Sequence, residues 1–114
     1  MALKTKRAYE PASTSDGTRY LVDRLWPRGL TKEKLAIDGW LKEIAPSEDL
    51  RTWFGHDPRK YVEFRRRFLE ELTSHREILD RLVDEARDGT VTLIYGSKDG
   101  EHCNAGVLHE ILSK

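Results

Sequence analysis

Residues 89–96, "GTVTLIYG", decide which fold class this chain belongs to. Their centre, from Val91 to Tyr95, is an apolar run bounded by glycines. A short run of this kind is typical of a strand that is covered on both faces, as the strands of a parallel sheet are. The rest of the chain should therefore supply helices for both faces and further strands for pairing.

Helices are predicted both before and after this strand in the sequence. One begins at Asp57, an N-cap followed by Pro58 at the first helical position, where the missing N–H costs nothing. The next begins with "SHRE", in which Ser74 and Glu77 have the spacing of a capping box, and Gly89 is its expected end. A third helix is predicted after the strand. The first helix has an apolar face of Tyr61, Phe64, Phe68 and Leu72, and the second has one of Ile78, Leu79, Leu82, Val83 and Ala86. The apolar face of the third is Val107, Leu108, Ile111 and Leu112.

Shorter elements are predicted in the first half of the chain. Strands are expected at residues 4–9 and 20–22, and Thr31 should cap a short helix that runs to Ala36. The segment "IDGWLKEIAPS", residues 37–47, fits a helix or a strand, and its glycine and proline favour a strand. Its last residue, Ser47, should begin another helix.

Strands that alternate with helices favour a mostly parallel sheet with helices packed against it. We therefore predict an α/β fold with about four strands, formed by residues 1–114 as a single small domain. Apolar residues make up 38% of the chain and charged residues 35%, which is a globular balance.

The charge balance limits the classes of partner. Lys and Arg together number 20, as do Asp and Glu, so the formal net charge is zero. A domain that binds nucleic acid usually has a positive excess, because phosphate contacts supply much of the affinity. Nucleic acid is therefore an unfavoured partner, although "FRRRF" at residues 64–68 leaves open a binding module for nucleic acid or protein. The sequence gives no indication of the oligomeric state.

The sequence favours a cytoplasmic protein without metal or cofactor. It has one cysteine, so it forms no internal disulfide, and no segment is long and apolar enough for a signal peptide or a membrane span. The spacing of the histidines and the cysteine predicts no metal site. Glycine patterns for nucleotide phosphates are also absent, so no cofactor is predicted.

The segment "HCNAGVLH", residues 102–109, resembles the H-C-x-x-G-x-x-R loop of cysteine-dependent phosphatases. His109 stands where that loop has arginine, and imidazole cannot form the two-pronged hydrogen bond of a guanidinium. Several residues also separate the strand from Cys103, which should carry the thiol into the first turn of the next helix. We therefore expect a half-buried structural cysteine. A phosphatase-like or sulfur-transfer enzyme is the less favoured alternative, with His102 and Cys103 as weak catalytic candidates and Arg24 or Arg28 as the missing cation.

A ligand site is predicted where the strands end. In parallel α/β sheets, ligands bind beyond the carboxyl ends of the strands. "DRLWPRG", residues 23–29, places two guanidinium groups beside an indole at one such end, which suits an anionic or planar ligand. A structural ion pair with a tryptophan over the core is the competing interpretation. The predicted ligand-binding residues are Asp23, Arg24, Trp26, Arg28, Lys98, His102 and Asn104.

A third cluster, "TWFGHDPRKY" at residues 52–61, surrounds a turn. Trp53 and Phe54 could form a lid over the crevice or a plug under the helix corner, and we expect the plug. His56 lies beside the cap residue Asp57, so its imidazole is expected to support that turn, and a general-base role is the alternative.

Four strings, "LVDRLWPRGL", "LKEIAPS", "LRTWFGHDPRKYVEFRRRF" and "VTLIYGSKDGEHCNAGVL", resemble the YeaO-like family of bacterial proteins, grouped as domain of unknown function 488. The resemblance extends over residues 6–112 and implies a small intracellular α/β domain. It implies three hallmark motifs, formed by Asp23, Arg24, Trp26, Pro27, Arg28 and Gly29; by Trp53, Phe54, His56 and Asp57; and by His102 and Asn104. A wider branch of the family ends its last loop in E-x-x-x-x-x-C-H-R. This chain has Cys103 followed by Asn104 and Ala105, so the cationic partner beside the cysteine is missing.

Overall fold

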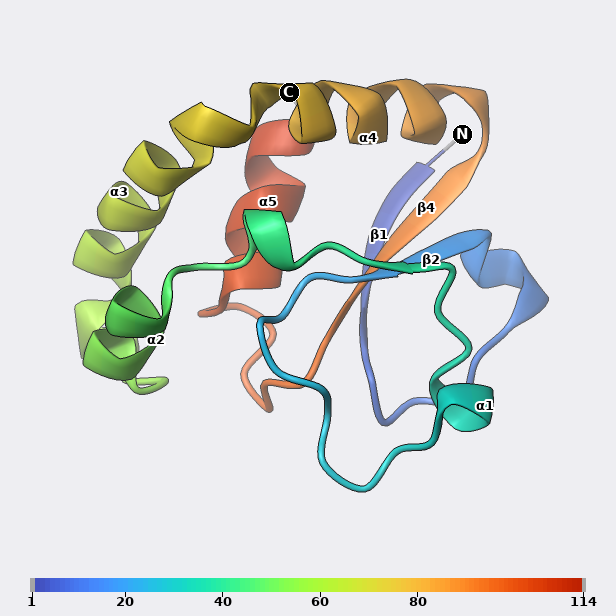
Figure 1. The fold of residues 1–114 in the computed structure, drawn as a ribbon, viewed down its shortest axis with the longest axis horizontal. Coiled ribbons are helices and arrows are strands. Elements are labelled where there is room, and N and C mark those ends of the chain that lie inside the picture. Colours follow the sequence, from blue (N-terminus) through green and yellow to red (C-terminus); the bar gives the residue numbers. More distant parts are fainter. Residues whose placement is uncertain (1, 114) are drawn as a thin grey trace.

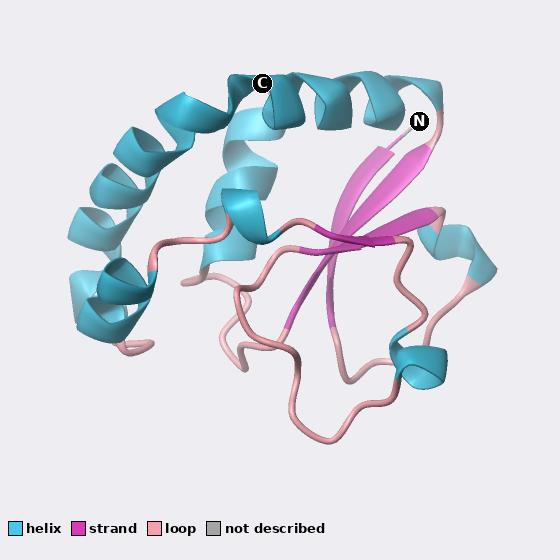
Figure 2. Ribbon diagram, in the orientation of Figure 1, coloured by secondary structure: helices cyan, strands magenta, loops and turns pink. Residues whose placement is uncertain are grey.

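The computed structural model describes residues 2–113, and they form a four-stranded sheet in which all neighbours run parallel (Figures 1 and 2). The strands are β1 (Ala2–Arg7), β2 (Thr18–Leu21), β3 (Gly39–Trp40) and β4 (Thr90–Tyr95), in the order β1-β4-β2-β3. The predicted α/β class with a parallel sheet is confirmed.

Strand β4 is the central element of the sheet. It pairs with β1 from Ala2 opposite Thr90 to Arg7 opposite Tyr95, and it pairs with β2 on its other side. Val91, Leu93 and Tyr95 are buried in the larger of two apolar clusters, whereas Ile94 belongs to the smaller one. Because side chains alternate along a strand, the apolar run supplies both faces of the sheet, as predicted.

The helices are divided unequally between the two faces. Helices α2 (Glu48–Phe54), α3 (Tyr61–Leu72), α4 (Arg76–Asp88) and α5 (Asn104–Leu112) lie on one side of the sheet, and the short α1 (Lys32–Leu35) lies on the other (Figure 1). The larger core lies under the four helices and contains the stacked rings of Phe54 and Phe64, with centroids 4.1 Å apart. None of the helices within residues 2–113 is long and apolar enough to cross a bilayer.

The predicted N-caps at Thr31 and Asp57 are confirmed, and Ser47, which was predicted to begin a helix, is also an N-cap. Each side chain accepts a hydrogen bond from a backbone N–H inside the turn that follows it. Asp57 caps a 3₁₀ turn, Pro58–Lys60, from which α3 continues directly. These caps satisfy N–H groups that have no partner inside the helix.

The predicted capping box at Ser74 is wrong. The backbone keeps right-handed helical angles at Leu72 and Thr73 and continues through a 3₁₀ turn, Thr73–His75, into α4. A capping serine needs an extended backbone, which this continuous path does not provide. The position before α4 is His75, and it makes no side-chain cap. The helix ends at Gly89, as predicted.

The segment 37–47 forms a strand, but one of only two residues. β3 pairs with β2 through Gly39 and Trp40, and a 3₁₀ turn follows at Lys42–Ile44. The other two strands of the first half are close to their predicted positions, with β1 beginning and ending two residues earlier than expected.

A buried ionic network fixes the loop between β1 and β2. Asp16 and Arg19 are 4% and 3% exposed, and Arg19 Nη1 lies 2.5 Å from Asp16 Oδ2. Lys6 Nζ donates to the same carboxylate at 3.1 Å, and the Arg19 guanidinium also donates to Leu35 O, the last residue of α1. Burial opposes ionisation of Asp16. The hydrogen bonds from Ser13 N–H, Lys6 and Arg19 outweigh it and hold the Asp16 pKa below its ordinary value.

We predict that Asp16→Asn destabilises the protein by about 3 kcal/mol at pH 7, because it leaves a buried guanidinium without its counter-charge. The Asp16 pKa is lowered by folding, so its contribution is complete at neutral pH. The contribution is lost as the pH falls through the folded-state pKa, below about 4. Urea unfolding at pH 7 and pH 3 measures both effects, and the gap between wild type and variant should narrow in acid.

Asp84→Asn is the matched control, because the Asp84–Arg87 pair is 3.7 Å apart and exposed. Its effect on the free energy of unfolding should stay within about 0.5 kcal/mol. Equal effects of the two substitutions at pH 7 would contradict the assigned role of the buried network.

Candidate functional site

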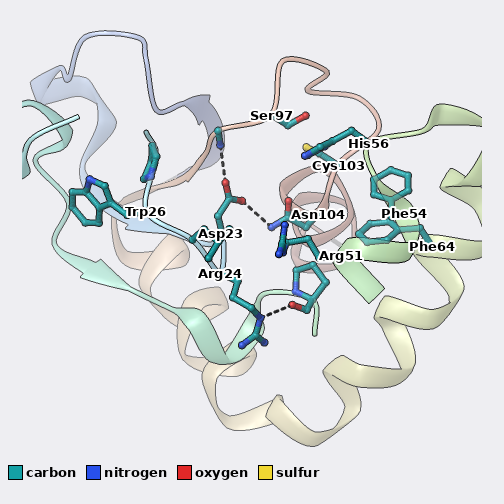
Figure 3. A pocket seen from close by; sticks show the side chains of 14 residues that line it. Asp23, Arg24, Trp26, Arg51, Phe54, His56, Phe64, Ser97, Cys103 and Asn104 are labelled. Atoms are coloured by element: carbon teal, nitrogen blue, oxygen red, sulfur yellow. Dashed lines mark hydrogen bonds between the residues drawn. The ribbon is translucent and has the colours of Figure 1, made fainter. Parts of the chain in front are cut away.

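A cavity of about 200 Å³ lies beyond the carboxyl ends of β2 and β4 (Figure 3). We call it the sheet-edge cavity and define it by Asp23, Arg24, Trp26, Arg51 and Asn104, which are among the side chains that line it. In an all-parallel sheet the carboxyl ends share one edge, so segments distant in sequence meet there. Four of these five residues were predicted from the sequence as ligand-binding residues.

Asp23 lies just after β2 and connects that strand to the segment that follows β4. Its Oδ2 accepts the backbone N–H of Gly96 at 2.8 Å, and its Oδ1 accepts from Asn104 Nδ2 at 3.1 Å (Figure 3). Burial raises the pKa of Asp23 above its ordinary value, and the bonds from Gly96 and Asn104 oppose that rise. The carboxylate therefore serves first to hold the walls of the cavity together.

Asn104, the first residue of α5, is held by its amide nitrogen. Nδ2 donates to Val22 O at 2.9 Å as well as to Asp23 Oδ1. Both partners are acceptors, so only the nitrogen of the amide can occupy this position. The Oδ1 atom has no hydrogen-bond partner within residues 2–113, and Figure 3 shows it on the side of the amide away from Asp23.

Arg51 brings a positive charge into the cavity from α2. Its Nε is buried and has no hydrogen-bond partner, and its guanidinium forms no ion pair with any described residue. Helix α2 is well anchored, because Ser47 N–H and Oγ donate to the two carboxylate oxygens of Glu71 at 2.7 and 2.6 Å. A buried guanidinium nitrogen without a hydrogen-bond partner is costly, which makes Arg51 the most informative residue of the site.

Sequence reasoning missed Arg51. One signal was available: it stands three residues before Phe54, which was expected to plug the core, so the two share a helical face. The plug itself is confirmed for Phe54, which is 4% exposed and stacks on Phe64. Trp53 is half-buried, with Arg67 and Lys60 over its ring at 4.4 and 5.1 Å.

Arg24 and Trp26 form another part of the wall. Arg24 Nε donates to Pro46 O at 2.9 Å, and Arg24 also lines a second hollow of about 330 Å³. Trp26 lies edge-on to Trp40, with ring centroids 5.5 Å apart, and its indole N–H donates to Leu30 O at 2.7 Å. Because that N–H is already used, Trp26 offers the cavity mainly an apolar, planar surface.

Three predicted ligand-binding residues do not line the sheet-edge cavity. Arg28 and Lys98 have exposed side chains, and the backbone oxygen of Arg28 accepts from Tyr9 Oη at 3.0 Å. His102 Nδ1 lies 2.7 Å from Asp99 Oδ2, and its ring meets Tyr61 edge-on at 5.1 Å. Hydrogen bonding to His102 lowers the pKa of Asp99. The position of a residue after a strand does not fix the direction of its side chain. Here Arg28 and Lys98 are exposed to solvent, and His102 contacts Asp99 and Tyr61.

His56 lines the cavity instead and has an unusual backbone. It follows Gly55, and both residues are in the left-handed region, with φ of 57° and 53°. This conformation is uncommon for a residue with a side chain, and such strain concentrates at functional sites. The imidazole has no hydrogen-bond partner within residues 2–113, so its predicted support of the Asp57 turn does not come from a side-chain bond.

Cys103 is the residue before α5; it is 1% exposed and lies against the sheet-edge cavity. Its Sγ lies 3.6 Å from Gly100 O, and burial raises the pKa of the thiol despite the nearby N–H groups of Gly106 and Ala105. The expectation of a half-buried residue inside the helix was therefore wrong in both details, because the loop folds over the thiol before the helix begins. His109, at the arginine position of the phosphatase pattern, contacts Leu3 O on β1 at 3.0 Å.

The arginine run in α3 is largely neutralised by glutamates. Arg65 pairs with Glu110, Arg66 pairs with Glu63 and Glu70, and Arg67 pairs with Glu63. Such pairing is typical of a solvated helix face. Within residues 2–113, no group of three His, Cys, Asp or Glu side chains could hold a metal ion.

The fold and the cavity define a small α/β protein whose parallel sheet has, at its carboxyl edge, a cavity lined by Arg24, Arg51 and Asp23, among other residues. The sequence model described as "Inactive DUF488-N3 subclade" matches residues 2–114, and the chain belongs to this family. The family resemblance predicted from the sequence is thereby confirmed.

Relatives are similar over almost their whole length. "Uncharacterized protein YeaO" from Escherichia coli (strain K12) is 46% identical over 112 residues, covering 98% of this chain and 97% of the relative. "Uncharacterized protein Mb3100c" from Mycobacterium bovis and "Uncharacterized protein Rv3073c" from Mycobacterium tuberculosis are each 33% identical over 111 residues, covering 97% of this chain and 93% of each relative. No solved structure gives a significant match.

We predict that Cys103 in the folded protein reacts at least about 100-fold more slowly with a chromogenic aromatic disulfide than in the unfolded chain, because reaction requires a local opening. The chain has one cysteine, so the absorbance change reports this residue alone. The same protein in concentrated urea is the control. A native rate close to the denatured rate would contradict the buried, protonated thiol.

Proposed function

We propose that this protein binds a small anionic ligand with a planar body in the sheet-edge cavity. The observation that carries the proposal is Arg51, which lines this cavity and whose buried Nε has no hydrogen-bond partner within residues 2–113. A group of this kind needs an acceptor, and an anion is the strongest one for a guanidinium. The cavity also lies where α/β sheets place their ligand sites.

The charges around the cavity favour an anion. Arg24, Arg51 and His56 line it, and the one carboxylate among its lining residues, Asp23, already accepts bonds from Gly96 and Asn104. Within residues 2–113, Arg24 donates from Nε to Pro46 O, and its other guanidinium nitrogens have no hydrogen-bond partner. The formal charge of the lining side chains is therefore positive, and a low local dielectric strengthens its attraction for an anion.

The apolar walls favour a flat ligand body. Phe54 and Phe64 form one wall as a stacked pair, and Trp26 and Pro46 contribute others. A volume of about 200 Å³ lies below the usual range of about 300–1,000 Å³ for ligand pockets. This size suits one ring with one acidic group.

Binding without cysteine chemistry is the version that we propose. Nucleophilic catalysis needs a thiolate, and Cys103 is buried, with a pKa raised by desolvation and no hydrogen bond to an imidazole within residues 2–113. The family description "inactive" agrees with this proposal. The pairing of the α3 arginines gives no specific support to the nucleic-acid alternative.

Arg51→Gln should weaken binding of phenyl phosphate by about 10- to 100-fold, because a charged hydrogen bond contributes about 1.5–3 kcal/mol. Isothermal titration with phenyl phosphate, benzoate and neutral phenol measures this loss. The wild type should bind the two ring anions and not phenol.

Arg87→Gln is the matched control, because Arg87 is an exposed arginine at the far end of α4. It should bind both ring anions as the wild type does. Wild-type protein that binds neither ring anion, or an Arg51→Gln variant that binds them unchanged, would overturn the proposal.

A further inference from the structure

We infer that the ligand of the sheet-edge cavity carries a hydrogen-bond donor in addition to its anionic group, and that Asn104 Oδ1 accepts from this donor. The inference rests on the proposed function and narrows it to one chemical class. The class is a small ring acid that bears an O–H or N–H group. Arg51 would bind the acid and Asn104 would select for the donor.

The orientation of the Asn104 amide carries the inference. An amide can turn over and exchange its oxygen and nitrogen, unless its partners distinguish them. Here Nδ2 faces Val22 O at 2.9 Å and Asp23 Oδ1 at 3.1 Å. A turned amide would place its oxygen against a carbonyl and a carboxylate, so Oδ1 is fixed as the outward acceptor.

This acceptor differs from the oxygens of Asp23, Gly96, Ser97 and Pro46 around the same cavity, because those oxygens already take part in hydrogen bonds. Both carboxylate oxygens of Asp23 accept hydrogen bonds, and the Ser97 hydroxyl bonds to the backbone of Asp99 at 3.2 Å. The backbone oxygens of Gly96, Ser97 and Pro46 accept from arginines. Asn104 Oδ1 has no partner within residues 2–113, so a ligand donor has an acceptor ready for it.

Rigidity makes this acceptor selective. Asn104 begins α5, and its amide is tied to β2 through Val22 and Asp23, so it cannot turn away from a ligand that lacks a donor. Closing the cavity with such a ligand would leave a polar oxygen dry and unpaired. Sites of this kind reject analogues that cannot make the hydrogen bond.

The test keeps the protein unchanged and varies the ligand, because substituting Asn104 would also release Asp23. Calorimetry compares benzoate, 3-hydroxybenzoate and 4-hydroxybenzoate with the two corresponding methoxybenzoates. The ethers keep the ring, the charge and the oxygen but remove the donor. We expect at least one hydroxybenzoate to bind about tenfold more tightly than both its ether, which adds a methyl group, and unsubstituted benzoate, the equivalent of about 1.4 kcal/mol.

The outcomes separate this inference from the proposed function. In one outcome both ethers bind as well as their hydroxybenzoates, and Arg51→Gln still weakens the binding of all of them. The ligand's donor then contributes nothing to affinity, so the inference fails while the proposed function stands. If neither benzoate nor any derivative binds, both fail. If the preference for the hydroxy form persists in Arg51→Gln at lower affinity, the two groups act separately and the inference holds.

Discussion

The carboxylate of Asp23 is the interaction on which the sheet-edge cavity depends. It accepts one hydrogen bond from Gly96 N–H, after β4, and one from the Asn104 amide, at the start of α5. Burying a carboxylate is costly, and these two bonds offset the cost only while all three segments stay together. One side chain thus fixes the end of β2, the loop after β4 and the orientation of the amide that faces the cavity. The raised pKa of Asp23 reflects the same burial.

The hydrogen bonding of Arg51 differs from that of the other arginines discussed above. Arg19 is also buried, but Asp16 and Leu35 O satisfy it, and the arginines of α3 have glutamate partners. Arg51 alone among the described residues leaves a buried side-chain nitrogen without a hydrogen bond. Asp23, the carboxylate that lines the same cavity, accepts hydrogen bonds from Gly96 and Asn104 and none from Arg51. The protein therefore keeps an uncompensated donor at the position where a ligand would arrive, which is the pattern of a preorganised binding site.

The strand ends at which the site lies could be predicted, because sheet-edge location follows from a parallel topology and needs no atomic detail. Asp23, Arg24, Trp26 and Asn104 were predicted in this way to bind a ligand, and all four line the cavity. The direction of each side chain could not be predicted. Lys98 and His102 lie in the same segment as Asn104, yet one is exposed and the other pairs with Asp99.

The sequence by itself determined the α/β class, the central strand, the helix caps at Thr31, Ser47 and Asp57, and the absence of the guanidinium in the cysteine loop. These features depend on neighbours in the chain, through periodicity, capping and spacing. Only the tertiary structure decided that Arg51 of α2 lines the cavity, that Cys103 is buried, and that the Asn104 amide nitrogen bonds to Val22 and Asp23 and leaves its oxygen without a partner within residues 2–113. Each of these three features depends on contacts between segments that are distant in sequence. Local sequence patterns do not contain the information about which side chain of a loop contacts which partner.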